Sequence, residues 1–197
     1  MRRDIKVNIT LTVVNLNNSN LSKTMYNKEQ GIIRLNNFEG KADGYRDGLY
    51  TKDNITSFEV NYKVVNSLDK VEKNDHVLII ANNVDNDVNS SGDGVGISTT
   101  GGRIGAVSSS NIGNNTFDQV AQHELGHNLG LKHSEFKDLM YPKVSGNTSL
   151  SNKKKGDIIN NQISPTSNSG VSKESSRYKS SSKTEAERFI EIHEIGK

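Results

Sequence analysis

The chain has 197 residues, a formal net charge of +2 at pH 7 and no cysteine. Without cysteine, disulfides and thiolate metal sites are excluded, and the small net charge gives no electrostatic reason to expect a nucleic-acid partner or an anionic membrane surface. Hydrophobic residues make up only 31%, against roughly 45–50% in typical domains when glycine is included. We therefore expect one domain followed by a tail outside its core, and no apolar run is long enough to span a membrane.

The first part of the chain is predicted to be mostly strands. Residues 5–16 alternate between apolar and polar side chains and are rich in β-branched residues, which is typical of a strand with one buried face. Residues 57–66 repeat this pattern and predict a second strand. Between them, residues 17–30 allow one short helix, and residues 31–56, which contain four glycines, indicate loop or weak strand.

Three further strands and a long loop are predicted before residue 110. Residues 75–82 form a short, continuous apolar run, as expected of a strand buried on both faces. Residues 103–109 predict another strand, and residues 95–98 a short edge strand before it. Residues 83–102 are dense in Asp, Asn, Ser and Gly, which indicates a surface loop.

Two sets of side chains in this region could bind a metal ion, but a structural role is favoured for both. Asp85, Asp87 and Asp93 could bind calcium, but their spacing does not match an EF-hand loop. A solvated turn is therefore favoured, and Ca²⁺ is an open but unsupported alternative. His76 stands alone at the edge of a predicted strand, which favours a structural or surface role over metal ligation.

A helix is predicted from about residue 116 to residue 130. Asn115 or Thr116 is suited to its N-cap, and the charge of Asp118 is favourable in its first turn. Apolar residues recur at helical spacing and predict a buried stripe. The members of this stripe are Phe117, Val120, Ala121, Leu125 and Leu129. The stripe leaves the two histidines and the glutamate of the same segment facing a cleft.

The most informative segment is 123–133, which contains His-Glu-Leu-Gly-His-Asn-Leu-Gly-Leu-Lys-His. On a helix, His123 and His127 lie one turn apart on the same face. Gly130 then allows a sharp turn that returns His133 toward the same point. Three neutral imidazoles that converge beside a carboxylate are what a catalytic zinc ion requires.

The composition changes after the third histidine. Residues 138–142 predict a tight turn that carries a buried methionine, and residues 148–163 allow a second helix. Residues 164–182 are rich in Ser, Asn, Lys and Gly, which is typical of a flexible linker. Residues 183–195 could form a terminal amphipathic helix.

We therefore divide the chain into two parts. Residues 1–163 are predicted to form the folded domain, with an N-terminal subdomain at 1–130 and a C-terminal subdomain at 131–163. Residues 164–197 are predicted to be a flexible linker and a short terminal helix.

The pattern His-Glu-x-x-His-x-x-Gly-x-x-His, followed by Leu-Met-Tyr-Pro, resembles the metzincin zinc metallopeptidases. The matching residues are His123, Glu124, His127, Gly130 and His133, with Met140 in the position of the family's Met-turn. Ser134 and the Met-Tyr-Pro turn most resemble the matrixins, although the structural-zinc histidines of the matrixins have no counterpart here. A minimal bacterial metzincin is the description that this resemblance favours.

The resemblance implies an α+β fold: a twisted mixed β-sheet of about five strands, a long active-site helix, and a small C-terminal subdomain after the zinc motif. It also implies that residues 1–163 are a catalytic domain that hydrolyses peptide bonds as a zinc-dependent endopeptidase. Its substrates would be proteins or peptides, and we expect a monomer with no nucleic-acid partner and no membrane span.

By the same resemblance, the three histidines hold one Zn²⁺ ion, and the glutamate is the general base that activates a water molecule. The methionine forms an apolar floor under the histidines and is not a ligand, and the two residues after it begin the wall of the S1′ pocket. The zinc ligands are thus His123, His127 and His133, and the general base is Glu124. The methionine is Met140, and the residues of the pocket wall are Tyr141 and Pro142. A strand at 94–98 or 103–109 would pair with an extended substrate.

A second function from another class stays open: a catalytically silent, zinc-dependent module that binds peptides in the same cleft. Glu124 argues against it, because silent relatives typically lose that residue. Residues 7–16 alternate between apolar and polar side chains, so the start of the chain is not a secretory signal. We expect a processed or excised domain that acts outside the producing cell or is delivered into a target cell, one version being the effector domain of a larger bacterial toxin.

Overall fold

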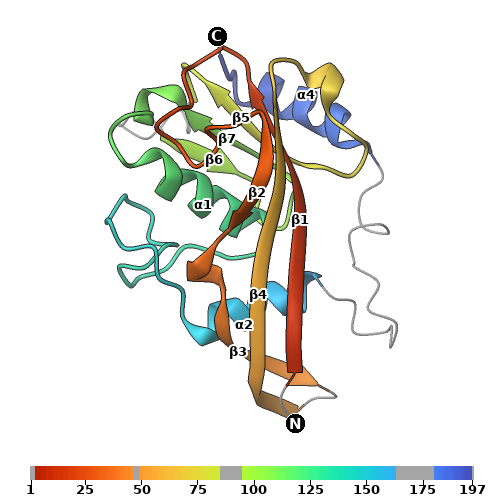
Figure 1. Ribbon diagram of the computed structural model, residues 1–197, viewed down its shortest axis with the longest axis vertical. Helices are drawn as coiled ribbons and strands as arrows, with labels where there is room; N and C mark the ends of the chain where they lie inside the picture. The colour runs from red at the N-terminus through yellow and green to blue at the C-terminus, as the bar shows by residue number, and fades with distance from the viewer. Residues whose placement is uncertain (1–2, 47–48, 85–94, 163–179, 197) are drawn as a thin grey trace.

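The computed structural model describes residues 3–46, 49–84, 95–162 and 180–196. In these residues the chain forms a seven-stranded sheet and three α-helices (Figure 1). The strands are β1 (Arg3–Asn15), β2 (Gln30–Arg34), β3 (Gly40–Arg46), β4 (Leu49–Val65), β5 (His76–Ala81), β6 (Gly96–Ser98) and β7 (Ile104–Ser108). The helices are α1 (Phe117–Asn128), α2 (Asn152–Gln162) and α4 (Ser182–Ile192), and the 3₁₀ turns are η1 (Asn36–Phe38), η2 (Leu68–Lys70) and η3 (Ser109–Asn111).

The sheet is mixed and has the strand order β2-β4-β1-β5-β7-β6, with β3 paired to β4 beside this path. β4, β1, β5 and β7 are parallel, whereas β2, β3 and β6 pair antiparallel with their neighbours. β1 and β4 run most of the length of the molecule (Figure 1). β5 is buried at every position, which confirms the strand predicted from its continuous apolar run. The short strand β6 ends the order and confirms the predicted edge strand.

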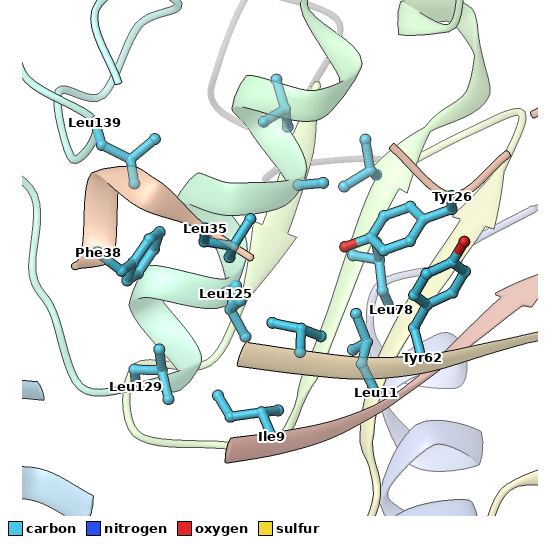
Figure 2. Close-up of a cluster of buried hydrophobic side chains, with 14 of the residues drawn as sticks. Ile9, Leu11, Tyr26, Leu35, Phe38, Tyr62, Leu78, Leu125, Leu129 and Leu139 are labelled. Atoms are coloured by element: carbon cyan, nitrogen blue, oxygen red, sulfur yellow. The ribbon is translucent and has the colours of Figure 1, made fainter. Parts of the chain in front are cut away.

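One face of the sheet packs against α1 and forms the larger hydrophobic core. Leu11 of β1 and Leu78 of β5 belong to the same buried cluster as Leu125 and Leu129 of α1 (Figure 2). Each of these four side chains is at most 5% exposed. Burial of apolar surface is the main favourable contribution to folding, so this core holds α1 in a fixed position on the sheet.

The opposite face of the sheet packs against α4. Successive side chains of a strand alternate between its two faces, so Val14, Ile79 and Ala106 point away from α1. They form a second buried cluster with Ala186 and Phe189 of α4. The C-terminal helix therefore shares a core with the central strands.

Arg103, which directly precedes β7, ties the start of α4 to the sheet. Its side chain is 1% exposed and forms a bidentate ion pair with Glu185, at 2.9 Å and 3.2 Å. The same guanidinium donates hydrogen bonds to the backbone carbonyls of Lys73 and Ser180. A buried guanidinium without acceptors would be strongly unfavourable, so these partners hold the helix and the sheet together.

The prediction of about five strands is wrong, because the sheet has seven. Residues 31–56 were expected to be loop or weak strand, but they contain most of β2, all of β3 and the start of β4. These strands form by pairing, β2 and β3 each lying antiparallel to β4. Hydrogen bonds to a partner strand outweigh the weak β propensity of a glycine-containing segment, and local composition does not show the partner.

The short helix predicted within residues 17–30 is also wrong, because residues 17–29 form turns. Asn15 Oδ1 accepts the N–H of Ser19, and Asn20 Oδ1 accepts the N–H of Ser22. Such side-chain bonds to nearby backbone groups compete with the hydrogen bonds of a helix. The density of asparagine and serine therefore decides the conformation here.

The C-terminal elements follow the sequence closely. α2 lies within residues 148–163, and the terminal helix expected at 183–195 corresponds to α4. The expected linker falls almost entirely on residues 163–179, outside the described residues, as do Asp85, Asp87 and Asp93. The division of the chain at residue 163 stays a prediction. None of the described helices is long and apolar enough to cross a membrane.

Replacing Arg103 by methionine should lower the free energy of unfolding by about 2–3 kcal/mol, because the ion pair loses its buried partner. The loss is limited because water still reaches part of the Glu185 side chain. Thermal and urea unfolding would measure the loss. The matched control is Arg34→Met, which removes an exposed pair with Glu39 and should cost about 0–1 kcal/mol. Equal losses in the two variants would contradict the role given to Arg103.

Candidate active site

Helix α1 carries three of the predicted site residues and is anchored by its buried stripe. The five apolar residues predicted for that stripe are all buried. Thr116 is the N-cap but makes no capping hydrogen bond through its side chain. Asp118 instead accepts the backbone N–H of Met25 at 2.8 Å, and this bond ties the first turn of the helix to the segment between β1 and β2.

Helix α1 ends in a Schellman motif. The N–H of Leu131 donates to the carbonyl of Gly126 at 2.9 Å, and the N–H of Gly130 donates to the carbonyl of His127 at 2.8 Å. Gly130 has a φ of 97°, in the left-handed region that favours glycine. A Cβ atom at this position would also overlap the side chain of Asn161 in α2. Both requirements select glycine where the chain turns back toward the helix.

The structure brings His123, His127 and His133 together, with one ligating nitrogen from each ring and all three nitrogens within 4.8 Å of one another. His127 is buried, His123 is half-buried and His133 is exposed. Within the described residues, this is the one group of three or more His, Cys, Asp or Glu side chains that could hold a metal ion. His76 lies apart from it, buried in β5.

Backbone carbonyls fix the orientation of two of these rings. His123 Nδ1 lies 2.7 Å from the carbonyl oxygen of Leu139, and His127 Nδ1 lies 2.7 Å from that of Leu131. A carbonyl oxygen can only accept a hydrogen bond, so each Nδ1 carries the hydrogen. The two Nε2 atoms are 3.0 Å apart, and in the neutral rings both present a lone pair.

This arrangement fits a zinc ion. Burial lowers the pKa of His127 to about 4 and also lowers the pKa of His123, so both rings are neutral near pH 7. Two facing lone pairs repel each other unless a cation lies between them. Tetrahedral zinc with nitrogen ligands at about 2.0–2.1 Å sets neighbouring nitrogens about 3.3 Å apart, close to the 3.0 Å that separates these two nitrogens.

Glu124 lies beside the histidines and is held by the edge strand. Glu124 is 5% exposed, and its carboxylate accepts a hydrogen bond from Ser98 Oγ at 2.5 Å. Gly96 makes room for it, since a Cβ atom there would lie only 2.6 Å from Glu124 Oε1. Burial raises the pKa of Glu124 to about 7, against the opposing effect of the Ser98 hydrogen bond. A nearby dication would lower this pKa again by favouring the carboxylate.

The turn at 138–142 lies under α1, as the sequence predicts. Met140 is completely buried and packs so closely on the helix that a Cβ atom at Gly126 would lie 2.5 Å from its Sδ. The backbone N–H of Met140 donates to Asp138 Oδ1 at 2.9 Å. These contacts position Leu139, whose carbonyl orients the ring of the first histidine.

A cleft of about 710 Å³ contains the three histidines and Glu124. Tyr141 and Pro142, predicted as part of a pocket wall, do line this cleft. The short strand β6 lines another side of it. A volume of this size is typical of sites that enclose small molecules or parts of a peptide.

Sequence reasoning missed several residues of the cleft, and four of them depend on contacts between distant segments. Ser98 was assigned to a possible edge strand that would pair with substrate, but its contact with Glu124 was not foreseen, because this contact depends on the pairing of β6 with β7. Ile192, His193 and Glu194 line the cleft from the end of α4, far from the motif in the sequence. No local pattern could show that this helix lies beside the sheet edge.

The fold and the site together define a class of protein. A mixed sheet that carries a helix with two histidines, followed by a glycine turn and a third histidine, is the arrangement of the metzincin zinc metallopeptidases. A family model named Reprolysin_5 and described as metallo-peptidase family M12 matches residues 1–172. The chain belongs to this family. A search of curated proteins gave no match.

The family match covers the whole histidine motif and ends before α4. It confirms the metzincin resemblance at the level of the clan. The closer resemblance to the matrixins, drawn from Ser134 and the Met-Tyr-Pro turn, stays a prediction.

Zinc binding should resist mild acid and fail as the pH approaches 4. Ligation needs neutral imidazoles, and the lowered pKa values of His123 and His127 delay protonation to a pH below that of an ordinary histidine. Competition with a chromophoric chelator between pH 7.5 and pH 4 would measure the affinity. His127→Ala, which lacks one ligand, is the control for weak binding. An affinity that does not change down to pH 4 would contradict histidine ligation.

Gly130→Ala should lower the free energy of unfolding by about 2–4 kcal/mol, from left-handed backbone strain together with the overlap with Asn161. It should also weaken zinc binding, because the turn places His133. Gly146→Ala is the matched control: its φ is 75°, but no atom lies within 4 Å of the added Cβ. Calorimetry of the two variants separates strain from overlap, and equal losses would show that the contact with Asn161 is unimportant.

Proposed function

We propose that this protein is a zinc-dependent endopeptidase. The observation that carries the proposal is the position of Glu124, a buried carboxylate beside three converging imidazoles in an open cleft. Two of the imidazoles have their Nδ1 atoms committed to backbone carbonyls, so their Nε2 lone pairs are directed to a metal. Three protein ligands leave a coordination position for water or substrate.

When bound, a zinc ion would supply Lewis-acid chemistry to a water molecule and to the carbonyl of the scissile bond. Glu124 accepts the proton of the attacking water and then delivers it to the leaving amine. Burial raises the pKa of this carboxyl group, and a bound zinc ion would lower it by favouring the carboxylate, which is the form that accepts the proton. Ser98 holds the carboxylate in one orientation through its hydroxyl group.

The sheet edge and the methionine turn would position the substrate. β6 lines the cleft at the end of the strand order, so an extended peptide could lie beside it as an additional strand. Tyr141 and Pro142 stand at the side of the cleft formed by the turn, which supports their assignment to an S1′ wall. Met140 supports the histidines from below and takes no part in the chemistry.

Several finer features stay proposals. We infer proteins or peptides as substrates, a monomer as the active form, and action outside the producing cell or inside a target cell after delivery. Residues 1–163 would be the catalytic domain, and α4 would complete its second core and one side of its cleft. The alternative function, a silent module that only binds zinc and peptides, predicts the same zinc affinity without hydrolysis.

Glu124→Gln should retain zinc and lose peptidase activity by about 10²–10⁴-fold, since the amide keeps the shape and can still accept from Ser98 but cannot take a proton. Casein or a peptide library would be digested with and without a chelator, and zinc content would be measured for each variant. Glu135→Gln, at an exposed carboxylate outside the cleft, is the control. Activity of Glu124→Gln within tenfold of wild type would refute the base assignment, and an inactive wild type would favour the silent module.

A further inference from the structure

The end of α4 forms part of the cleft that contains the histidines. Ile192, His193 and Glu194 line this cleft together with His123 and Glu124. The helix lies beyond the residues that match the family model. This part of the cleft is therefore supplied by a segment outside the matched region.

The geometry of this end is fixed by its own Schellman motif. The N–H of Ile195 donates to the carbonyl of Ile190 at 3.1 Å, and the N–H of Glu194 donates to that of Glu191 at 3.4 Å. Ile195 is buried against the second core. Glu194 has a φ of 48°, at the position where glycine or asparagine is usual.

The side chains at this end combine an apolar and an anionic group. Ile192 is 74% exposed and lines the cleft, so its side chain offers apolar surface to a ligand there. Glu194 is exposed, and among the described residues no ion pair involves it. The C-terminal end of a helix also carries partial negative charge, which favours cations. A long side chain with an apolar stem and a positive end matches all three features.

The two faces of the edge strand β6 indicate how a substrate peptide bound beside it would contact the end of α4. Ser98 of β6 faces α1 and Glu124, whereas its neighbour Ile97 packs against the cluster formed with α4. Side chains of an extended peptide beside β6 would alternate in the same way. One set would face the histidines, and the next would face the end of α4.

We propose that Ile192 and Glu194 form a subsite for a lysine or arginine side chain of the substrate, on the face of the sheet opposite the histidines. The proposal rests on the peptidase function proposed above. The aliphatic stem would lie on Ile192, and the cationic group would pair with the Glu194 carboxylate. The subsite would select a basic residue at one substrate position. The side chains of the two adjoining substrate residues would point to the other face of the sheet, where the histidines lie.

Cleavage of a proteome-derived peptide library, with the products identified by mass spectrometry, tests this subsite. Glu194→Asn removes the charge but suits the left-handed backbone, and Ile192→Ala shortens the apolar contact. Glu191→Gln is the matched control, since it removes an exposed carboxylate on the same turn that does not line the cleft. Wild type and Glu191→Gln should both favour lysine or arginine at one position.

Glu194→Asn should lose that preference, and its kcat/KM for a basic peptide should fall about three- to fivefold through KM, as expected for one exposed ion pair. Its activity on the matching neutral peptide should fall less than its activity on the basic peptide, so the ratio of the two kcat/KM values is the readout. Wild-type cleavage with no basic preference, or a preference that survives in Glu194→Asn, would overturn the subsite and leave the peptidase function standing. Absence of cleavage by wild-type protein loaded with zinc would overturn both.

Discussion

The left-handed turn at Gly130 is the constraint on which the site depends. It ends α1 one residue after His127 and returns the chain so that the Leu131 carbonyl lies beside the ring of His127. The turn also allows His133 to reach the two helical histidines. Asn161 of α2 fills the space that a side chain would need, so the second helix helps to fix the turn. One backbone conformation thereby sets both the ligand geometry and the tautomer of a ligand.

The edge strand adds the second requirement, which is the position of Glu124, the proposed base. Glu124 is adjacent to a ligand in sequence, but its carboxylate is positioned by β6, through the hydroxyl of Ser98 and the open space at Gly96. The antiparallel pairing of β6 with β7 holds that strand. The position of Glu124 therefore depends on the sheet, while the positions of the histidines depend on the helix and its turn.

The features that could be predicted from the sequence are those that a local pattern of residues specifies. The buried strand β5, the buried stripe of α1 and the motif from His123 to His133 each have a periodicity or spacing that reveals them. Long-range pairing is different. The contacts that make strands of residues 31–56, the hydrogen bond from Ser98 and the position of Ile192 all depend on a partner distant in the chain. Because the sequence does not reveal that partner, the glycines of residues 31–56 predict a loop, and the C-terminal helix is predicted to lie outside the folded domain.

In the proposed function, the two faces of the sheet would have different roles, one in catalysis and the other in substrate recognition. The core under α1 supports the histidines and Glu124, and the core under α4 supports the proposed basic subsite. Arg103 fixes the first turn of α4, while the proposed subsite lies at its last turn, and a helix transmits position between its ends because its backbone hydrogen bonds make it stiff. Loosening the ion pair at Arg103 should therefore disturb substrate preference before it disturbs metal binding. The side chains of the short strand β6 alternate between the two faces, so a peptide bound beside it would connect the proposed subsite on one face with the proposed hydrolysis on the other.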